Sequence, residues 1–185
     1  MILNPKTLIE KRIISFSETI NIEQYLQQIG IDIDCIKIYE NKLFENKITL
    51  IGKEIKKTPE QLELTTMQLA DSGIEVFYLY KGHSYLFESS FKVEVPINMC
   101  CKGLVNRSTF NRNGVMIRSG IFDPGYQGTI GGTIYCFNDI LIEKGTRIAQ
   151  FVMEECDSYS LYSGQYQGVL GEGLVNNSPT NNTTV

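Results

Sequence analysis

The chain has 185 residues, of which 42% are hydrophobic and 21% charged, and its formal net charge is −4. This composition is typical of one globular domain with a sizeable core, which is expected to span residues 1–175. The negative charge argues against a broad surface for a nucleic-acid polymer, but a nucleotide pocket needs only two or three local arginines. No run approaches the ~20 apolar residues of a membrane span.

The N-terminal run and the cysteines point to a reducing compartment. The run MILNPKTLIEKRII lacks the charged-then-apolar layout of a signal peptide, so a cytoplasmic protein is expected. The five cysteines are odd in number and have no CxxC spacing, which argues against a zinc site or a disulfide framework and favours buried or idle thiols. His83 is the sole histidine, which removes most histidine-based catalysis, and its place on a turn predicts a structural role.

The first 68 residues predict short helices, one strand and a peripheral region. Residues 4–11 are predicted to form a short helix, with Asn4 as N-cap and Pro5 at the first helical position. Residues 21–29 are predicted to form a second helical turn or a loop. The run IGIDIDCIKIYE alternates isoleucine with polar residues at period two, which predicts a strand. Residues 42–68 are polar, and we expect peripheral strands and loops there.

From Gly73 onward the pattern is almost wholly β. Gly, Pro, Asn and Asp separate short apolar runs at intervals of roughly 8–12 residues, the usual spacing of a sandwich or barrel. We therefore expect a mostly β single domain, a distorted barrel or jelly roll with a short N-terminal helix. Residues 176–185 are polar and low in complexity, which predicts a loose tail. The predicted strands are the runs IEVFYLY, SYLFES, FKVEVP, GLVNRST, GVMIRSG, GTIGGTIYCF, DILIEK and RIAQFVMEE.

The stretch RSTFNRNGVMIRSGIFDPGYQG, residues 107–128, carries most of the chemistry. Arg107 and Arg112 lie on a predicted polar turn, with the hydroxyls of Ser108 and Thr109 beside the first arginine. Guanidinium groups keep their charge and offer several fixed donors, which suits phosphate oxygens. Two surface arginines on a β-turn are the alternative.

The end of the same stretch is a predicted tight turn, DPGYQG. Asp123 there either only forms the turn, as Asp-Pro-Gly sequences do, or orients a water or a sugar hydroxyl. Tyr126 offers a flat face for a ring. Together with the arginines these residues would suit a nucleoside triphosphate.

Five motifs in order give the chain a resemblance to the superfamily of dCTP deaminases and trimeric dUTPases, over roughly residues 1–170. RSTFNRNGV resembles the RSSLARxGv segment of the deaminases, and SGIFDPGYQG resembles the GxIDxGYxG segment of both branches. GIDI, residues 30–33, resembles GIDL. GTRIAQFVME, residues 145–154, resembles GxRIAQLvfe, and YSGQYQG, residues 162–168, resembles the YxGkYQGQ tail of the deaminases.

The resemblance implies roles for the residues of the first long motif. Arg107 and Ser108 would meet phosphate or the reactive water, with Thr109 as a further candidate, and Arg112 would lie near the reacting base. Asp123 would contact the deoxyribose and help orient the attacking water. Tyr126 would stack beneath the sugar and exclude a 2′-hydroxyl.

The other motifs imply a metal, a lid and an assembly. Asp32 would lie near Mg²⁺ and the phosphates, and the alternative is a polar residue of an alternating strand. Arg147 and Gln150 would lie close to the triphosphate or to subunit contacts. Tyr166 and Gln167 belong to a tail that would close over the nucleotide. The family is typically a homotrimer with pockets between subunits, so the same is expected here.

One departure from the deaminase pattern bears on the reaction. The deaminases carry a glutamate on the strand after the DPG turn, and residues 128–138 of this chain contain neither Glu nor Asp. Depending on the direction of counting, its place falls on Thr133 or Tyr135, and neither side chain readily replaces a carboxylate as a base near pH 7. The run is about two residues longer than the family's, so a bulge is predicted at Gly131 and Gly132.

Three functions fit these residues. The first is a diphosphatase that cleaves a deoxynucleoside triphosphate to the monophosphate and pyrophosphate, with dUTP as the favoured substrate. The second is a dCTP deaminase with a relocated base, for which Glu143 and Glu154 are candidates. The third is a nucleotide-binding or sequestering protein without catalysis, since a fold does not fix a function.

Overall fold

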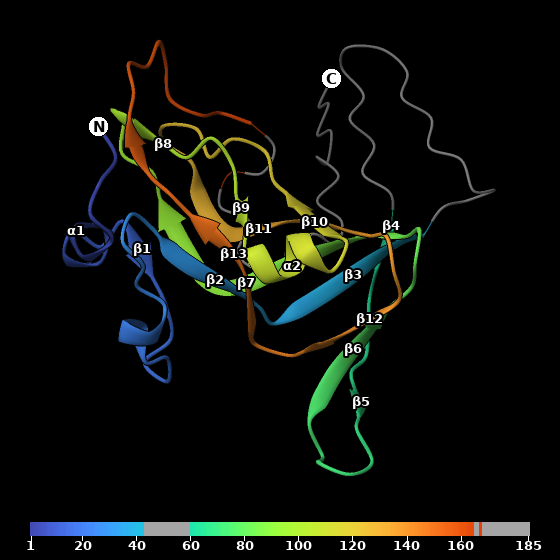
Figure 1. The fold of residues 1–185 in the computed structure, drawn as a ribbon. Coiled ribbons are helices and arrows are strands. Elements are labelled where there is room, and N and C mark those ends of the chain that lie inside the picture. Colours follow the sequence, from blue (N-terminus) through green and yellow to red (C-terminus); the bar gives the residue numbers. More distant parts are fainter. Residues whose placement is uncertain (43–59, 165–166, 168–185) are drawn as a thin grey trace, which may run out of the picture.

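The computed structural model describes residues 1–42, 60–164 and 167. Figure 1 shows a mostly β fold with a few short helices. The prediction of a mostly β, jelly-roll-like domain with a short N-terminal helix is confirmed. In the described residues the strands form separate sheets and do not close into one barrel.

Two of these sheets enclose the core. The smaller one has the order β2 (Ile31–Cys35), β13 (Thr146–Phe151) and β9 (Val105–Asn106). The larger one has the order β10 (Val115–Arg118), β11 (Gln127–Cys136), β7 (Ser84–Glu94), β3 (Lys37–Lys42) and β4 (Glu60–Glu63), with β1 (Ile14–Ser15) beside β7.

Two smaller sheets extend the body. One has the order β12 (Ile140–Glu143), β6 (Glu75–Leu79) and β5 (Met67–Gln68), and in Figure 1 its β5–β6 end projects away from the rest. The other pairs β14 (Glu154–Glu155) with β8 (Met99–Cys100). The peripheral strands expected within residues 42–68 are found as β4 and β5, whereas residues 43–59 lie outside the described part.

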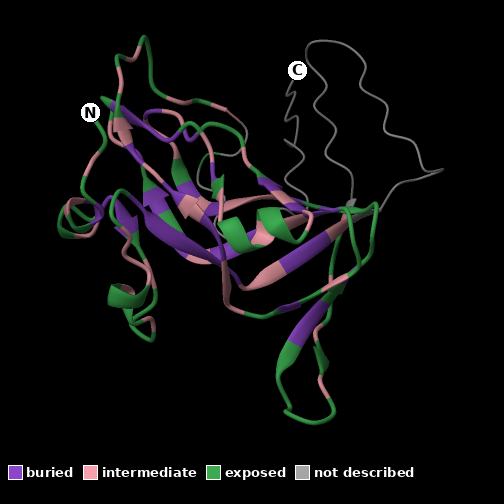
Figure 2. Ribbon diagram, in the orientation of Figure 1, coloured by how far each residue is buried: buried purple, intermediate pink, exposed green. Residues whose placement is uncertain are grey.

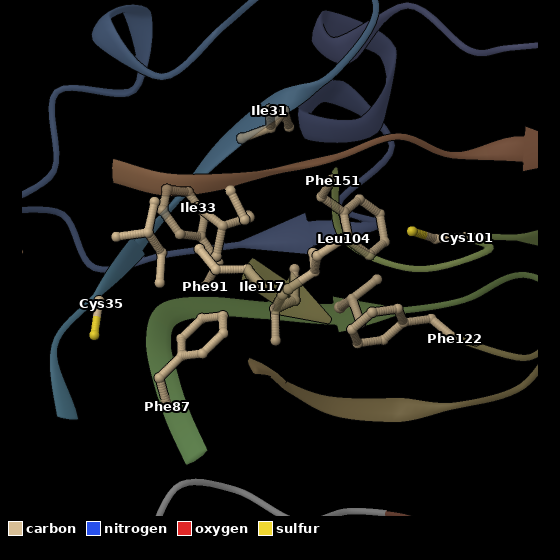
Figure 3. Close-up of a cluster of buried hydrophobic side chains, with 14 of the residues drawn as sticks. Ile31, Ile33, Cys35, Phe87, Phe91, Cys101, Leu104, Ile117, Phe122 and Phe151 are labelled. Atoms are coloured by element: carbon tan, nitrogen blue, oxygen red, sulfur yellow. The ribbon is translucent and has the colours of Figure 1, made fainter. Parts of the chain in front are cut away.

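The core lies between the two main sheets. Ile33 of β2 and Phe151 of β13 point toward Phe87 and Phe91 of β7 and Ile117 of β10, as Figure 3 shows. All of these side chains are at most 2% exposed, and burying each large apolar side chain contributes about 1.5–3 kcal/mol. The burial colouring of Figure 2 places the buried residues on these same central strands.

Strand β2 differs from the sequence prediction. The alternating run was expected to be one strand, but it breaks at Ile36 into β2 and β3, which belong to different sheets. Moreover, all five residues of β2 are buried. Asp32 and Asp34, which alternate with the isoleucines, therefore do not face solvent. Two buried carboxylates must therefore be satisfied by other groups of the protein.

Two of the three short helices are where the sequence predicts them, and the third is not. Helix α1 (Pro5–Glu10) begins as expected, with Asn4 Oδ1 accepting a hydrogen bond of 2.9 Å from the amide of Lys6. The expected helical turn within residues 21–29 is a 3₁₀ helix, η1 (Ile22–Gln24). The GLVNRST run was wrongly predicted as a strand, because only β9 is extended there and helix α2 (Ser108–Arg112) follows at once.

The bulge predicted at Gly131 and Gly132 lies instead on the neighbouring strand. Thr129 pairs with Lys92 and Gly131 with Glu88, so residues 89–91 of β7 stand opposite Ile130 alone. The two runs expected here as separate strands are one strand, β7, kinked by this bulge. Ser89 Oγ donates to the carbonyl of Ile130 at 2.7 Å and stabilises the irregular step.

No helix in the described part of the chain is long and apolar enough to cross a membrane. The tail expected at residues 176–185 lies outside the described residues, so its prediction stays untested.

Candidate functional site

A β-bulge positions the first arginine of the site. In β13, Arg147 pairs with Asp34 and Ala149 pairs with Ile33, so Ile148 is an extra residue in this strand. Bulges re-aim the neighbouring side chains. Arg147 therefore lies within reach of the next carboxylate along β2, that of Asp32.

The same bulge positions the second arginine. The amide of Arg107 donates to the carbonyl of Ile148 at 3.2 Å, and the carbonyl of Arg107 accepts from the amide of Phe110 at 3.0 Å. Arg107 is thus the N-cap of α2, with an extended φ of −69° and ψ of 142°. The polar turn predicted around Arg107 and Arg112 is a one-turn helix, which the two arginines begin and end.

Asp32 joins the two arginines. Its side chain is 1% exposed, and its Oδ2 accepts from Arg107 Nη1, from Arg147 Nη1 at 3.4 Å and from Gln27 Nε2 at 3.0 Å. Arg147 also donates to the carbonyl of Gln24, and its guanidinium lies 5.7 Å from the centre of the Tyr25 ring. A buried carboxylate needs such partners, because without them its desolvation would cost several kcal/mol.

The second buried carboxylate has different partners. Asp34 accepts from the amide of Ser90 at 2.8 Å and from its hydroxyl at 2.5 Å. Burial raises the pKa of Asp34, and the two hydrogen bonds from Ser90 oppose that rise. The bonds also fix the bulged part of β7 against β2, so Asp34 holds the two sheets together.

The electrostatics of the cluster favour an anion. Burial, and after it the charge of Arg147, lower the pKa of Arg107, although an arginine stays protonated in proteins. Burial and the charge of Asp34 raise the pKa of Tyr25, while Arg147 lowers it. A single carboxylate, Asp32, faces two cations, so an entering anion would relieve the repulsion between the arginines.

A pocket of about 410 Å³ opens beside the cluster. Its lining carries two positive charges and no negative one, together with two threonine hydroxyls and two aromatic rings. This is a lining for a polyanion that carries a ring. The lining residues are Gln24, Tyr25, Arg107, Thr109, Phe110, Gly145, Thr146 and Arg147.

The other expected phosphate-binding residues do not line this pocket. Ser108 and Arg112 are exposed on α2. Gln150 stands opposite Asp32 on β13, and its side chain lies against Gly30. Sequence reasoning missed five residues of the lining. Gln24 and Tyr25, at the end of η1, carry no motif, whereas Phe110, Gly145 and Thr146 lie within the quoted motifs but were not singled out.

The DPGYQG turn forms as expected. The amide of Tyr126 donates to the carbonyl of Asp123 at 3.0 Å, and Gly125 has a φ of +85°, which favours glycine. Tyr126 is half-buried, with its hydroxyl donating to the carbonyl of Thr129 at 3.1 Å. Its ring meets Phe122 and Tyr162 edge-on, with centroids 5.7 and 5.6 Å away, so protein rings already pack against it.

Tyr162 and Gln167 contact this turn. The amide of Tyr162 donates to the carbonyl of Pro124 at 2.7 Å. Gln167 donates from Nε2 to the carbonyl of Gly125 at 2.9 Å and accepts from the amide of Gln127 at 3.3 Å. Of the residues expected in the lid, Gln167 thus lies on the turn that carries Asp123, whereas Tyr166 is outside the described residues.

The described residues do not supply a cluster of metal ligands. They contain no group of three or more His, Cys, Asp or Glu side chains that would hold an ion. Asp32, the expected carboxylate, is already bound by Arg107, Arg147 and Gln27. Magnesium is commonly held by one or two carboxylates and substrate phosphates, so an ion here would have to arrive with a nucleotide.

The five cysteines are free, and four of them are buried, as the sequence predicted. His83 Nδ1 lies 3.3 Å from Oε1 of Glu40 in an exposed turn, in keeping with a structural role. The deaminase carboxylate is absent from β11: Thr133 is half-buried opposite Leu86, and Tyr135 is exposed. Glu143 is exposed on β12, and Glu154 pairs with Lys102 at 2.9 Å.

Comparison with known proteins identifies the family. Residues 5–156 match the family model described as dCTP deaminase-like, and the chain belongs to this family. A deoxyuridine 5′-triphosphate nucleotidohydrolase of Methanocaldococcus jannaschii is 32% identical over 147 residues, which cover 79% of this chain and 89% of the relative. A dCTP deaminase of Pyrobaculum islandicum is 36% identical over 74 residues, 37% of this chain and 41% of the relative.

A solved structure agrees on the fold. The 2′-deoxycytidine 5′-triphosphate deaminase from Agrobacterium tumefaciens superposes with a TM-score of 0.61 at 14% identity. The match covers 82% of this chain and 47% of that one. Both branches of the superfamily that the motifs resemble are therefore represented among the relatives.

Replacing Asp32 tests the ion cluster. Asp32→Asn leaves two half-buried arginines without a carboxylate, so we expect the free energy of unfolding to fall by about 3–5 kcal/mol. Urea unfolding with and without sulfate would measure this, and sulfate should restore more stability to the variant than to the wild type. Glu63→Gln, which removes an exposed ion pair of 3.9 Å with Lys37, is the control and should cost at most about 1 kcal/mol. Equal losses in both variants would contradict the assignment.

Proposed function

We propose that this protein is a deoxynucleoside triphosphate diphosphatase that converts dUTP to dUMP and pyrophosphate in pyrimidine deoxynucleotide metabolism. The observation that carries the proposal is the pocket whose lining holds Arg107 and Arg147 and no acidic residue. The relatives of similar length named deoxyuridine triphosphate nucleotidohydrolases support it, at 25–32% identity over most of their chains. We also propose a single domain that spans residues 1–175. A reducing, cytoplasmic location is part of the proposal too, and the free thiols support it.

In the proposed reaction, Arg107 and Arg147 bind the triphosphate by exchanging the carboxylate of Asp32 for phosphate oxygens. In the free protein Asp32 occupies donors of both guanidinium groups. A triphosphate carries more charge and more acceptor oxygens than one carboxylate, so it competes for those donors and brings Thr109 into the contact. Asp32, released in part, then faces the phosphates, where a magnesium ion bound to them would supply charge neutralisation.

Asp123 is the residue proposed to orient the attacking water. Its place in a tight turn fixes the backbone, and Tyr126 beside it would exclude a 2′-hydroxyl. Ser108 and Arg112, exposed on α2, would meet the nucleotide from the outer side of the helix, and Gln150 and Gln167 complete the proposed contacts. Water attack is the chemistry that a positioned carboxylate assists.

A homotrimer would bring together the two parts of the proposed site, the arginine pocket and the DPGYQG turn. Asp123 and Tyr126 are not among the residues that line the arginine pocket, and they lie on the loop between β10 and β11. If the turn of one subunit completes the pocket of the next, both halves contribute to one site. Ser108 and Arg112 are exposed in the single chain, as residues of a shared pocket would be.

Mixing inactive chains tests this arrangement. Asp123→Asn and Arg147→Gln chains should each be nearly inactive, but co-refolded mixtures should regain part of the activity, because some interfaces then combine two intact halves. Sedimentation should give the mass of three chains. An active monomer, or mixtures without regained activity, would contradict a shared pocket.

The reaction itself is tested with a panel of deoxynucleoside triphosphates and magnesium, with pyrophosphate and ammonia measured separately. Pyrophosphate from dUTP is expected. Arg147→Gln removes a charge-assisted contact worth about 1.5–3 kcal/mol, so kcat/KM should fall about 10–100-fold. Arg12→Gln, at an exposed arginine after α1, is the matched control and should leave kcat/KM unchanged. Tight binding of dUTP without turnover would instead support a sequestering protein.

Deamination is the second candidate, and one observation favours it. Glu88 of β7 is 6% exposed and stands opposite Gly131 of β11, so both lie on the same face of the sheet. Thr133 lies on that face too, two residues from Gly131, because side chains alternate along a strand. A buried carboxylate therefore lies diagonally across from Thr133, one of the two positions to which the resemblance assigns the glutamate of the deaminases.

The surroundings of Glu88 suit proton transfer. Burial raises its pKa, while Lys37 and a hydrogen bond with Tyr39 lower it. The charge of Glu88 also contributes to raising the pKa of Tyr126, which reaches about 12 mainly through burial. The carboxylate is thus electrostatically linked to the turn that carries Asp123.

Glu88→Gln separates the two reactions. If Glu88 is a relocated base, ammonia release from dCTP should fall by about 100-fold or more, because general acid–base groups contribute about 10²–10⁴-fold, and pyrophosphate release from dUTP should persist. Glu94→Gln, at an exposed position of the same strand, is the control. Ammonia release that is absent in the wild type, or unchanged in Glu88→Gln, would rule out this role.

A further inference from the structure

Two cysteines meet where β8 and β14 pair. Cys100 of β8 stands opposite Glu154 of β14. Two residues further on, the amide of Cys156 donates to the carbonyl of Asn98 at 2.9 Å, which continues the pairing. Because side chains alternate along a strand, Cys100 and Cys156 project from the same face of this ribbon, on a diagonal.

The two thiols face each other across the ribbon. The Cys156 thiol is close enough to contribute, after burial, to raising the pKa of the Cys100 thiol, and both cysteines are free. Diagonal residues on neighbouring strands lie about 7–8 Å apart, with their Cβ atoms somewhat closer. A disulfide between them therefore requires the two short strands to move slightly toward each other.

The neighbouring cysteine provides a contrast. Cys101 follows Cys100 in sequence, so its side chain leaves the opposite face of β8. It is 0% exposed, and its thiol donates to the carbonyl of Gly103 at 3.4 Å. Two adjacent cysteines are therefore in different environments, and only one of them faces Cys156.

We propose that Cys100 and Cys156 form a reversible disulfide when the protein meets a peroxide, and that this bond is a redox modification site separate from the arginine pocket. Cys156 is half-buried and Cys100 is buried, so Cys156 reacts first. Its sulfur takes one oxygen atom from the peroxide, which leaves as water, and becomes a sulfenic acid. The Cys100 sulfur then displaces the sulfenic oxygen as a second water, so two thiols and one peroxide give a disulfide and two waters.

The order of steps agrees with the local electrostatics. Burial raises the pKa of Cys100 to about 11, so little of this thiol is ionised at neutral pH and it is slow to attack peroxide directly. Glu154 also raises this pKa and Lys102 lowers it, and these two side chains pair with each other at 2.9 Å. Cys100 thus serves as the resolving thiol held next to the more exposed one.

The bond would tether both segments that lead to the DPGYQG turn. After β14 the chain continues to Tyr162, whose amide contacts the carbonyl of Pro124. After β8 it continues to Cys101, which forms a bridge with Phe122, next to Asp123. The N-terminus lies on the other side of β14, with the amide of Glu155 donating to the carbonyl of Met1 at 3.0 Å. Oxidation would therefore fix β14 and the segment after it relative to β8.

Peptide mapping tests the proposal directly. The protein is treated with hydrogen peroxide, its remaining thiols are alkylated, and the digest is analysed by mass spectrometry without reduction. We expect one linked pair of peptides, from residues 93–102 and from the segment that contains Cys156. The link should disappear in Cys100→Ser, persist in Cys101→Ser and be reversed by dithiothreitol. Because a bond that closes a long loop constrains the unfolded chain, the oxidised protein should also have a higher Tm.

Two results would overturn the proposal. One is a link that persists in Cys100→Ser and disappears in Cys101→Ser, which would assign the bond to the other thiol. The other is complete alkylation of Cys100 and Cys156 after a peroxide treatment that has oxidised exposed methionines. If Cys100→Ser is unstable, Cys156→Ser gives the same answer from the more exposed partner.

Discussion

The burial of one carboxylate, that of Asp32, is the constraint on which the arrangement of the site depends. Taking a carboxylate out of water costs several kcal/mol unless cations and donors surround it. Arg107 and Arg147 meet this requirement from two different elements, the start of α2 and strand β13. The ion cluster therefore fixes β2, β13 and α2 relative to one another, and it holds both guanidinium groups at the pocket.

Both bulges serve the same arrangement. The extra residue in β13, Ile148, aims Arg147 and accepts the amide of Arg107. The extra residues in β7 bring Ser90 to Asp34, which ties the larger sheet to β2. The two buried carboxylates of one short strand are thus satisfied by irregular steps in two neighbouring strands. A regular ladder would have placed these partners elsewhere.

Much of the fold can be predicted from the sequence because it rests on local signals. The cap of α1, the DPG turn and the apolar runs after Gly73 depend on residues close together in the chain. The pairing of Asp32 with Arg107 spans 75 residues, and no spacing rule connects them. Helix α2 was missed because its five residues follow two residues of true strand, and one turn of helix leaves no periodicity to detect.

Glycines 131 and 132 determine how closely β11 packs between its two neighbours. A side chain at Gly131 would collide with the carbonyl of Phe87, and one at Gly132 with the carbonyl of Arg118. At these two positions β11 is therefore held against both β7 and β10 by the absence of side chains. Glu88 is buried opposite Gly131, on the face of the sheet that also carries Thr133. A carboxylate is thus buried on this face although β11 supplies none, because the neighbouring strand β7 brings it there.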